Sequence, residues 1–174
     1  MVHNMNRLRG ITEKYNEFEQ AHPYLTTIGE TAIAYALRAG VRTAGDKMGL
    51  SFRHGRTHNP TRTRLIEEHP VASAFLAGVI APVAEETLYR HLPAKGLDKA
   101  ELEPNSTSRH AAEVGITALF AAQHAGKDGI PLPQFISGLN YQRIYDRRGL
   151  KHSMLAHGLS NAISILSAAR KRKP

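Results

Sequence analysis

The most constraining feature of this chain is a run of apolar and small residues that ends in two adjacent glutamates. Pro70–Ala84 contains 15 residues without Asp, Glu, Lys or Arg, and Glu85 and Glu86 follow it directly. Carboxylates at the end of an apolar helix must be paired or functional, because an unpaired charge in apolar surroundings is costly. We therefore expect these two side chains to belong to a functional or tightly paired site.

Apolar residues recur at helical spacing in five segments, and no alternating strand pattern is longer than a few residues. The predicted helices are Tyr24–Met48, Val71–Leu92, His110–His124, Gln134–Arg147 and Lys151–Ala169. The fold class is therefore all-α, a helical bundle.

Local signals set the expected boundaries of these helices. Pro82 should kink its helix or mark where that helix truly starts. Leu50–Arg64 is basic and predicted to be a loop, and so is the charged segment Pro93–Ser108. Ser108 or Thr107 is expected to cap the helix that follows. Arg148-Gly149 should close the fourth helix.

We divide the chain into three parts on these grounds. Residues 1–69 are expected to supply an N-terminal helix and a basic loop, and residues 70–170 a helical core. Residues 171–174 form a basic tail. Directly after the last helix, such a tail is expected to act as a cytoplasmic anchor at a membrane.

The charge of the chain indicates partners that carry phosphate. Lys and Arg number 23 against 15 Asp and Glu, which gives a net charge of +8. Nucleic acid and a membrane surface both fit this charge, and six basic residues gather between Arg53 and Arg64. Trp is absent and aromatic residues are 6%, so the chain offers few platforms for base stacking. We therefore expect membrane lipid as the partner and not nucleic acid.

The apolar runs favour a membrane protein. The segments Ser153–Ala169 and Pro70–Ala84 contain no Asp, Glu, Lys or Arg over 17 and 15 residues, close to the roughly 18 that define a candidate span. They are rich in Ala, Gly and Ser, which let membrane helices approach closely. The mean hydropathy of -0.36 keeps a soluble cytoplasmic form as the alternative. No run of signal-peptide type follows Arg7 and Arg9, so secretion is not expected.

Three predicted helices each carry a pair of side chains four residues apart, which places the pair on one helix face. The first holds Glu85, Glu86 and Arg90, of which Glu86 and Arg90 can pair. The other two hold Phe120 with His124, and His157 with Asn161. Taken singly, these motifs also fit a solvated acidic face, a core Phe beside an incidental His, and a polar contact between helices. The three together, in this order, are expected by chance in about one such sequence in a thousand.

The ordered motifs resemble the CPBP family, the intramembrane proteases related to the CAAX prenyl endopeptidase and the Abi proteins. The resemblance covers about Val71 to Ala169 and includes the linking segment from Phe135 to Gly149. It implies a membrane-embedded helical bundle whose motif helices surround a polar cavity. It also implies an intramembrane endopeptidase acting on the C-terminal tail of a peptide or protein, lipidated in the characterised prenyl proteases.

The resemblance further implies a role for each motif residue. Glu85 would be the general base that activates a water molecule, with His124 as its helper, and Phe120 would position His124. His157 and Asn161 would form the oxyanion hole. Glu86 and Arg90 would maintain the charge structure of the cavity.

Two alternatives to this mechanism remain open. Glu85, His124 and His157 are also the residue types that bind a divalent metal such as zinc with an open position for water. A non-catalytic immunity or scaffold protein of the same fold would use the motif residues only to join its helices. The chain departs from the family pattern at His91, where a small residue is usual and where the imidazole is expected to crowd the helix end. It also has fewer predicted helices upstream of the motifs.

Overall fold

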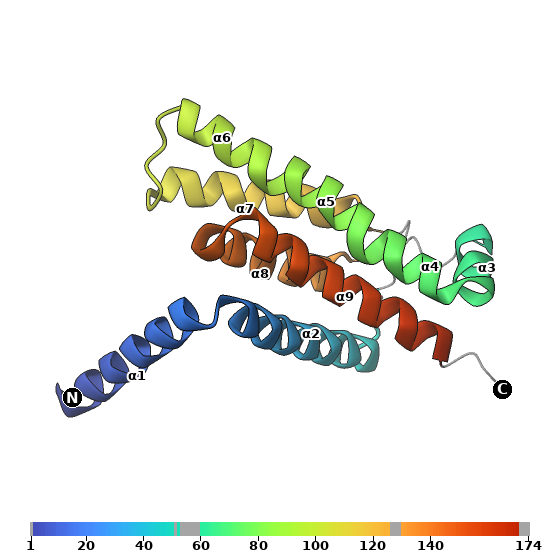
Figure 1. Ribbon diagram of the computed structural model, residues 1–174, viewed down its shortest axis with the longest axis horizontal. Helices are drawn as coiled ribbons and strands as arrows, with labels where there is room; N and C mark the ends of the chain where they lie inside the picture. Colours follow the sequence, from blue (N-terminus) through green and yellow to red (C-terminus); the bar gives the residue numbers. More distant parts are fainter. Residues whose placement is uncertain (1, 51, 53–59, 126–129, 171–174) are drawn as a thin grey trace.

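In the computed structural model, the described residues, which are 2–50, 52, 60–125 and 130–170, form helices and no strand. The helices are α1 (Val2–Ala21), α2 (Pro23–Lys47), α3 (Pro60–Glu68), α4 (Pro70–Phe75), α5 (Ala81–Glu86), α6 (Leu92–Lys99), α7 (Thr107–Ala122), α8 (Leu132–Arg148) and α9 (Leu150–Arg170). Two π-helical segments, η2 (Leu76–Ile80) and η3 (Thr87–His91), join α4, α5 and α6 into one rod (Figure 1). The prediction of an all-α bundle is confirmed.

Helix α9 is the centre of the bundle. It packs against α8 and α2 on one side and against the rod formed by α4, η2 and α5 on the other. Figure 1 shows α9 lying between α2 and the rod, with α7 and α8 behind. Gly149, with a φ of 82°, separates α8 from α9, and this conformation suits a residue without a Cβ. The chain can therefore reverse sharply and lay α9 back along α8.

A close crossing of two glycines brings α9 against the rod. A Cβ placed on Gly158 would lie 2.1 Å from the backbone oxygen of Gly78, and one placed on Gly78 would lie 3.3 Å from the oxygen of Gly158. No side chain fits at Gly158 without moving one of the two helices. The small residues of the apolar runs are thus a packing feature, which lets the backbones of η2 and α9 touch.

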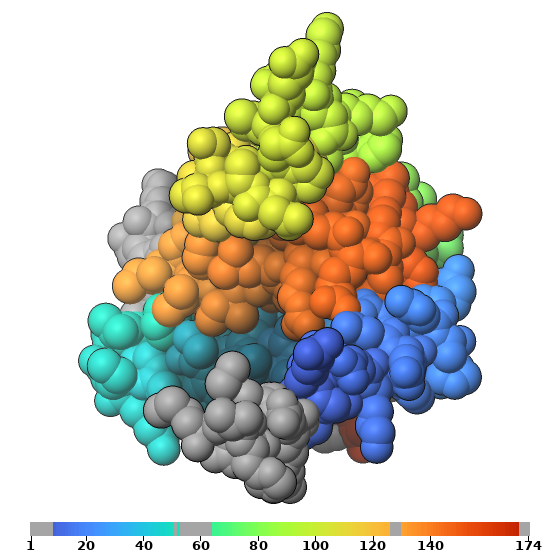
Figure 2. All heavy atoms as spheres, turned by 90° about the vertical axis from the view of Figure 1, so that its left-hand side faces the viewer, coloured from blue at the N-terminus to red at the C-terminus, as the bar shows by residue number. Residues whose placement is uncertain are grey.

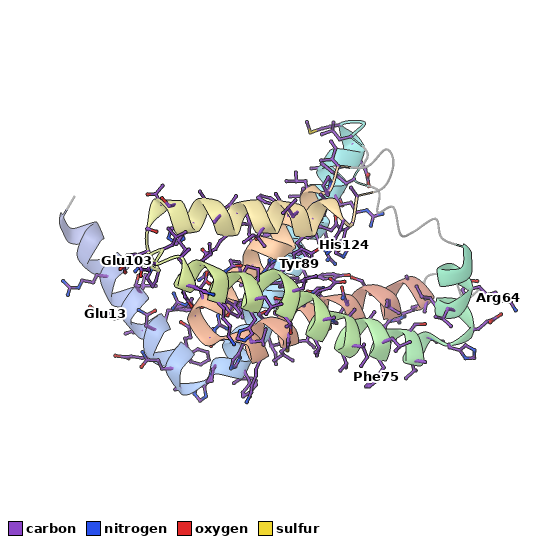
Figure 3. The ribbon with its side chains drawn as sticks, turned by 90° about the horizontal axis from the view of Figure 1, so that it is seen from above. Glu13, Arg64, Phe75, Tyr89, Glu103 and His124 are labelled. Carbon is purple, nitrogen blue, oxygen red and sulfur yellow. The ribbon has the colours of Figure 1, made fainter. Side chains whose placement is uncertain are left out.

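The rod from α4 to α6 is long and apolar enough to cross a membrane. It contains 30 residues, and its most apolar window has a mean hydropathy of 1.4 with 17% of that window buried. A core helix of a soluble protein would be mostly buried. Large apolar side chains along the rod are 44–76% exposed, namely Val71, Phe75, Leu76, Val79, Ile80, Val83, Leu88 and Leu92. Figure 3 shows Phe75 pointing away from the other helices.

Several predicted boundaries are confirmed and others are wrong. The helices predicted over Tyr24–Met48, Gln134–Arg147 and Lys151–Ala169 match α2, α8 and α9 within one or two residues. Ser106, and not Thr107 or Ser108, caps α7, because its side chain accepts from the Arg109 N–H at 3.2 Å. The first part of the segment Pro93–Ser108 continues the rod as α6 instead of forming a loop.

The N-terminal part contains more helix than expected. Val2–Ala21 forms α1, where the sequence predicted only the later helix from Tyr24. Pro60–Arg64 begins α3 and is not a loop, because Pro60 suits a first helical turn and Arg64 pairs with Glu68 one turn on, at 2.7 Å. The predicted loop before Pro60, with its basic residues from Arg53 to His58, lies outside the described residues.

Arginines at the end of α8 hold α1 and α2 to the bundle. Arg147 Nε donates to both Glu19 carboxylate oxygens, at 2.9 and 3.0 Å, and Arg148 lies 2.9 Å from the same group. Arg148 also pairs with Glu30 and donates to Thr27 Oγ1 at 2.8 Å. In Figure 2 the α8–α9 turn (orange) lies against α1 (blue) at this end of the molecule. The hydrogen bond from Arg147 holds the pKa of the Glu19 carboxyl below its usual range.

We predict that replacing Gly158 by Ala destabilises the protein, because the new methyl group would overlap the Gly78 carbonyl. Overpacking of this kind costs about 1–3 kcal/mol in free energy of unfolding. Gly115 in α7 is the matched control, because a Cβ there meets nothing within 4 Å. Thermal unfolding in detergent should show a lower midpoint for Gly158→Ala and an equal or higher midpoint for Gly115→Ala. Equal midpoints for Gly158→Ala and the wild type would refute the close crossing.

We predict that α1 detaches from the bundle in acid. The pKa of Glu19 is lower in the folded protein than in the unfolded chain, so its stabilisation is complete above about pH 4.3 and is lost below that value. Limited proteolysis of α1 should therefore accelerate as the pH falls from about 5 to 3. The Glu19→Gln variant should be cut readily at both of these pH values, because it has lost the carboxylate. Glu13→Gln, in the exposed pair with Arg9, is the control and should behave as wild type. Acid-independent cutting of the wild type would contradict this account.

Candidate active site

The buried carboxylate of Glu86 is the anchor of the predicted site. Its side chain is fully buried, and its Oε1 accepts from His157 Nδ1 at 2.8 Å. Ser153 donates its hydroxyl to Oε2, and Arg90 Nε lies 3.9 Å from the same oxygen. The predicted pairing of Glu86 with Arg90 is confirmed. Two donors and one cation from η3 and α9 thus compensate a single negative charge.

Arg90 is buried as completely as Glu86. Its guanidinium donates to the Tyr89 carbonyl at 2.9 Å and, from η3 across to α8, to the Gly138 carbonyl at 3.0 Å. It also lies over the Phe120 ring, 5.2 Å from the centroid. A Cβ on Gly138 would lie 2.8 Å from Thr117 Cγ2 and 3.2 Å from Arg90 Nη2. The glycine therefore makes the space that the guanidinium occupies.

Glu85 faces both motif histidines. Its Oε2 lies 3.7 Å from His124 Nε2 and 3.6 Å from His157 Nε2. The side chain of Glu85 is 16% exposed and that of His124 is 12% exposed, whereas His157 is 4% exposed. The two neighbouring glutamates thus lie in different surroundings, since Glu86 is sealed inside the bundle and Glu85 keeps contact with the exterior.

Hydrogen bonds to the backbone and to Glu86 fix which nitrogens point at Glu85. His124 Nδ1 lies 2.8 Å from the Phe120 carbonyl, which only accepts, so Nδ1 carries the proton. In the neutral ring, Nε2 then presents a lone pair toward Glu85. His157 is turned in the same way, with Nδ1 toward Glu86 and Nε2 toward Glu85. Both imidazoles therefore present Nε2 at one carboxylate oxygen.

Aromatic rings pack around the histidines. The Phe120 ring lies 4.8 Å from His124 and 5.7 Å from His157, measured between centroids. Tyr141 of α8 stacks on His157 at 4.7 Å with an angle of 16° between the planes. Tyr89 packs edge-on against Phe120 at 5.6 Å, and Figure 3 shows it close to His124 at the end of α7. Phe120 therefore contacts His124, the residue that it was expected to position.

Two prolines explain the π-helical segments on either side of the glutamates. The Ala81 N–H donates to Leu76, five residues back, and Pro82 has no N–H to donate. Helix bonding therefore leaves the Ala77 carbonyl open, and Asn161 Nδ2 donates to it at 2.8 Å. Pro93 follows η3 in the same way, after the Leu92 N–H donates to Thr87. Pro82 thus changes the helix bonding within the rod without ending it.

The structure brings five of the six predicted site residues into one cluster. Glu85, Glu86, Arg90, His124 and His157 are linked by the contacts above. Asn161 lies one turn beyond His157 on α9, and one of its amide N–H groups is committed to Ala77. His91 does not crowd the helix end as expected, because its Nδ1 turns to the Tyr145 hydroxyl at 3.2 Å.

Sequence reasoning missed Ser153, Tyr141 and Gly138. Ser153 precedes His157 by four residues, and this spacing could have predicted that the two side chains share a helix face. Tyr141 and Gly138 gave no such signal, since both act across helices that are distant in sequence.

The positions of Glu85, His124 and His157 bear on the metal alternative. Among the residues that the structure describes, no set of three His, Cys, Asp or Glu side chains is placed to hold a metal ion. The three candidate ligands lie together, since Nε2 of His124 and Nε2 of His157 face Glu85 Oε2 at 3.7 and 3.6 Å. The metal mechanism at these three residues stays a prediction.

Comparison with known families gives a match over the motif helices. The family model for Rce1-like type II CAAX prenyl endopeptidases matches residues 67–163. This segment is more than half of the chain and contains every predicted site residue. The chain belongs to this family. No curated protein and no solved structure shows significant similarity to the chain.

Membership of the Rce1-like family carries three consequences. The family activity is that of a peptidase, its members are embedded in membranes, and they act on the C termini of prenylated proteins. The rod Pro70–Lys99 supplies a helix able to cross the membrane. Helices α1 and α2 lie outside the matched segment, so the arginine contacts of α8 with Glu19 and Glu30 join the family core to a separate N-terminal part.

We predict strong energetic coupling between Glu86 and Arg90. Replacing Arg90 by Met, or Glu86 by Gln, leaves a buried charge without its partner, and each should cost about 3–5 kcal/mol in free energy of unfolding. The double variant should lose at least about 1 kcal/mol less than the sum of the single variants. Arg9→Met, in the exposed pair with Glu13, should cost under about 0.5 kcal/mol. Simple additivity at Glu86 and Arg90 would contradict the pairing.

Proposed function

We propose that this protein is an intramembrane endopeptidase of the CAAX type, which hydrolyses a peptide bond with a water molecule activated by Glu85. The substrate is the C-terminal part of a protein or peptide, with an attached lipid. The observation that carries the proposal is the position of Glu85 Oε2, which faces Nε2 of both His124 and His157 while the side chain keeps contact with the exterior.

Glu85 acts as the general base in this proposal. It takes a proton from a water molecule, and the water oxygen bonds to the carbonyl carbon of the scissile peptide. The C–N bond then breaks, and the proton held by Glu85 passes to the leaving amine. His124 supports the base, because its Nδ1–H is held by the Phe120 carbonyl and its Nε2 can accept a hydrogen bond from the same water.

His157 and Asn161 stabilise the negative oxygen that develops on the substrate carbonyl. The Asn161 side-chain amide has two N–H groups. One donates to the Ala77 carbonyl, and the other donates to the substrate oxygen in this proposal. His157 supplies the second donor from Nε2 when that nitrogen carries a proton. Donors fixed in advance lower the barrier, since they need no rearrangement as charge develops.

Glu86 and Arg90 keep the site electrically balanced. The guanidinium and the carboxylate are both buried, and together they bring no net charge into the bundle. Glu86 also fixes the orientation of His157 through the hydrogen bond at 2.8 Å. These two residues therefore shape the site without contacting substrate.

The proposed location is the cytoplasmic membrane. Support comes from the exposed apolar side chains of the rod and from the basic C-terminal sequence that follows α9. A lipid attached to the substrate would enter from the bilayer, where the exposed face of the rod already lies in this proposal.

A second candidate is a non-catalytic immunity or scaffold protein of the same fold. The contacts of Glu86 with Ser153 and His157, and of Asn161 with Ala77, favour it, because they join helices as a purely structural set would. Protection or scaffolding that survives loss of the Glu85 side chain would support this candidate.

We predict that Glu85→Gln abolishes cleavage and leaves the fold intact. Purified protein in liposomes should cleave a prenylated CaaX peptide and place one ¹⁸O from labelled water in the new carboxylate. The Gln variant should lose at least about 100-fold in rate, because an amide cannot accept the proton. Glu103→Gln, at an exposed position between α6 and α7, is the control. Undiminished cleavage by Glu85→Gln would remove Glu85 as the base, and inhibition by a chelator that zinc reverses would favour the metal mechanism.

A further inference from the structure

We propose that Tyr141 and Ser153 are positioning residues that hold the His157 imidazole in one plane, with Nε2 directed at Glu85. The expected effect on the cleavage rate rests on the proposed function, whereas the orientation of the His157 ring does not depend on it. Neither residue belongs to the motifs that the sequence revealed. Tyr141 comes from α8 and Ser153 from α9, so they approach the ring from different helices.

Tyr141 fixes the face of the imidazole. The two rings are nearly parallel, at 16°, with centroids 4.7 Å apart, and Tyr141 is 2% exposed. Phe120 meets the imidazole almost at a right angle, 87°, and closes a second direction. Rotation of the imidazole about its Cβ–Cγ bond would drive it into one of these two rings.

Ser153 fixes the edge of the imidazole through Glu86. Its hydroxyl donates to Glu86 Oε2, while Oε1 accepts from His157 Nδ1. Arg90 Nε lies 3.9 Å from Oε2, which is too long for a hydrogen bond. Without the serine hydroxyl, the carboxylate is free to rotate, and the direction of its bond to Nδ1 is no longer set.

These two constraints determine where Nε2 points. Nε2 lies on the opposite side of the ring from Nδ1 and 3.6 Å from Glu85 Oε2. A tilt of the ring therefore moves Nε2 away from the place where the substrate oxygen develops its charge. Misplacement of a catalytic group by about 1 Å can cost about 100-fold in rate. Tyr141 and Ser153 do not touch substrate in this account, and they act only through His157.

The test uses the full-length protein in detergent micelles with labelled histidine. Loss of one set of signals in His157→Gln assigns the His157 ring protons among the 10 histidines. In the wild type, stacking on Tyr141 should shift these ring C–H signals upfield, and the Nδ1–H should give a low-field signal. Tyr141→Leu should abolish the upfield shift, whereas Tyr141→Phe should keep it because the stacking ring remains. Ser153→Ala should broaden or move the Nδ1–H signal, and Ser153→Thr, which keeps the hydroxyl, should restore it.

Kinetics with the prenylated peptide give the second readout. Ser153→Ala and Tyr141→Leu should lower kcat about 10- to 100-fold with little change in KM, because they disturb the donor and not substrate binding. Ser153→Thr should recover most of the rate. Ser73→Ala is the matched control, since Ser73 is also buried and its hydroxyl donates to the Leu65 carbonyl at 3.1 Å, among residues outside the motifs. Should Ser153→Ala not fold, Ser153→Cys keeps the size and a weak donor and takes its place.

The possible outcomes separate this proposal from the proposed function. The proposal would be overturned if Ser153→Ala and Tyr141→Leu both showed the same His157 signals and the same kcat as Ser73→Ala. Signals that move together with a fall in kcat would support it. A wild-type protein that cleaves nothing would count against the proposed function, and the histidine signals alone would then decide whether Tyr141 and Ser153 hold the ring.

Discussion

The carboxylate of Glu86 has no contact with solvent, and a charge in that position requires several compensating groups. Arg90 provides the opposite charge, while Ser153 and His157 of α9 provide hydrogen bonds. Arg90 in turn needs the Gly138 carbonyl of α8. One buried charge thus ties the rod, α8 and α9 together. The position of His157, and hence the chemistry proposed for the site, depends on that arrangement.

The adjacent glutamates divide two tasks between them. Because they point in different directions from one helix, Glu86 enters the bundle and Glu85 remains 16% exposed. In the proposed mechanism, Glu86 therefore serves the structure and Glu85 reacts with water. The backbone assists this division, since the glycine crossing at Gly158 brings α9 close to the rod and Pro82 releases a carbonyl that binds Asn161.

Periodicity predicted most of the helices, and motif spacing predicted the five residues that cluster around Glu85 and Glu86. Apolar spacing predicted five helices because those helices bury one face against a neighbour, and spacings of four predicted which motif residues share a face. The segment Pro93–Ser108 was predicted to be a loop because it is charged, but its first part continues the rod as α6 directly after the π turn of η3. Helix α1 was missed because arginines distant in sequence hold it through Glu19. Tyr141 was missed for a similar reason, because stacking between two helices leaves no periodic signal in either one.

The central claim is that Glu86 maintains the site and Glu85 performs the chemistry. The most direct measurement compares two isosteric variants, Glu85→Gln and Glu86→Gln, for thermal unfolding and for cleavage of a prenylated peptide in the same liposomes. The account predicts that Glu85→Gln unfolds at the wild-type temperature and cleaves nothing, whereas Glu86→Gln unfolds at a clearly lower temperature. Wild-type stability of Glu86→Gln, or retained cleavage by Glu85→Gln, would contradict it.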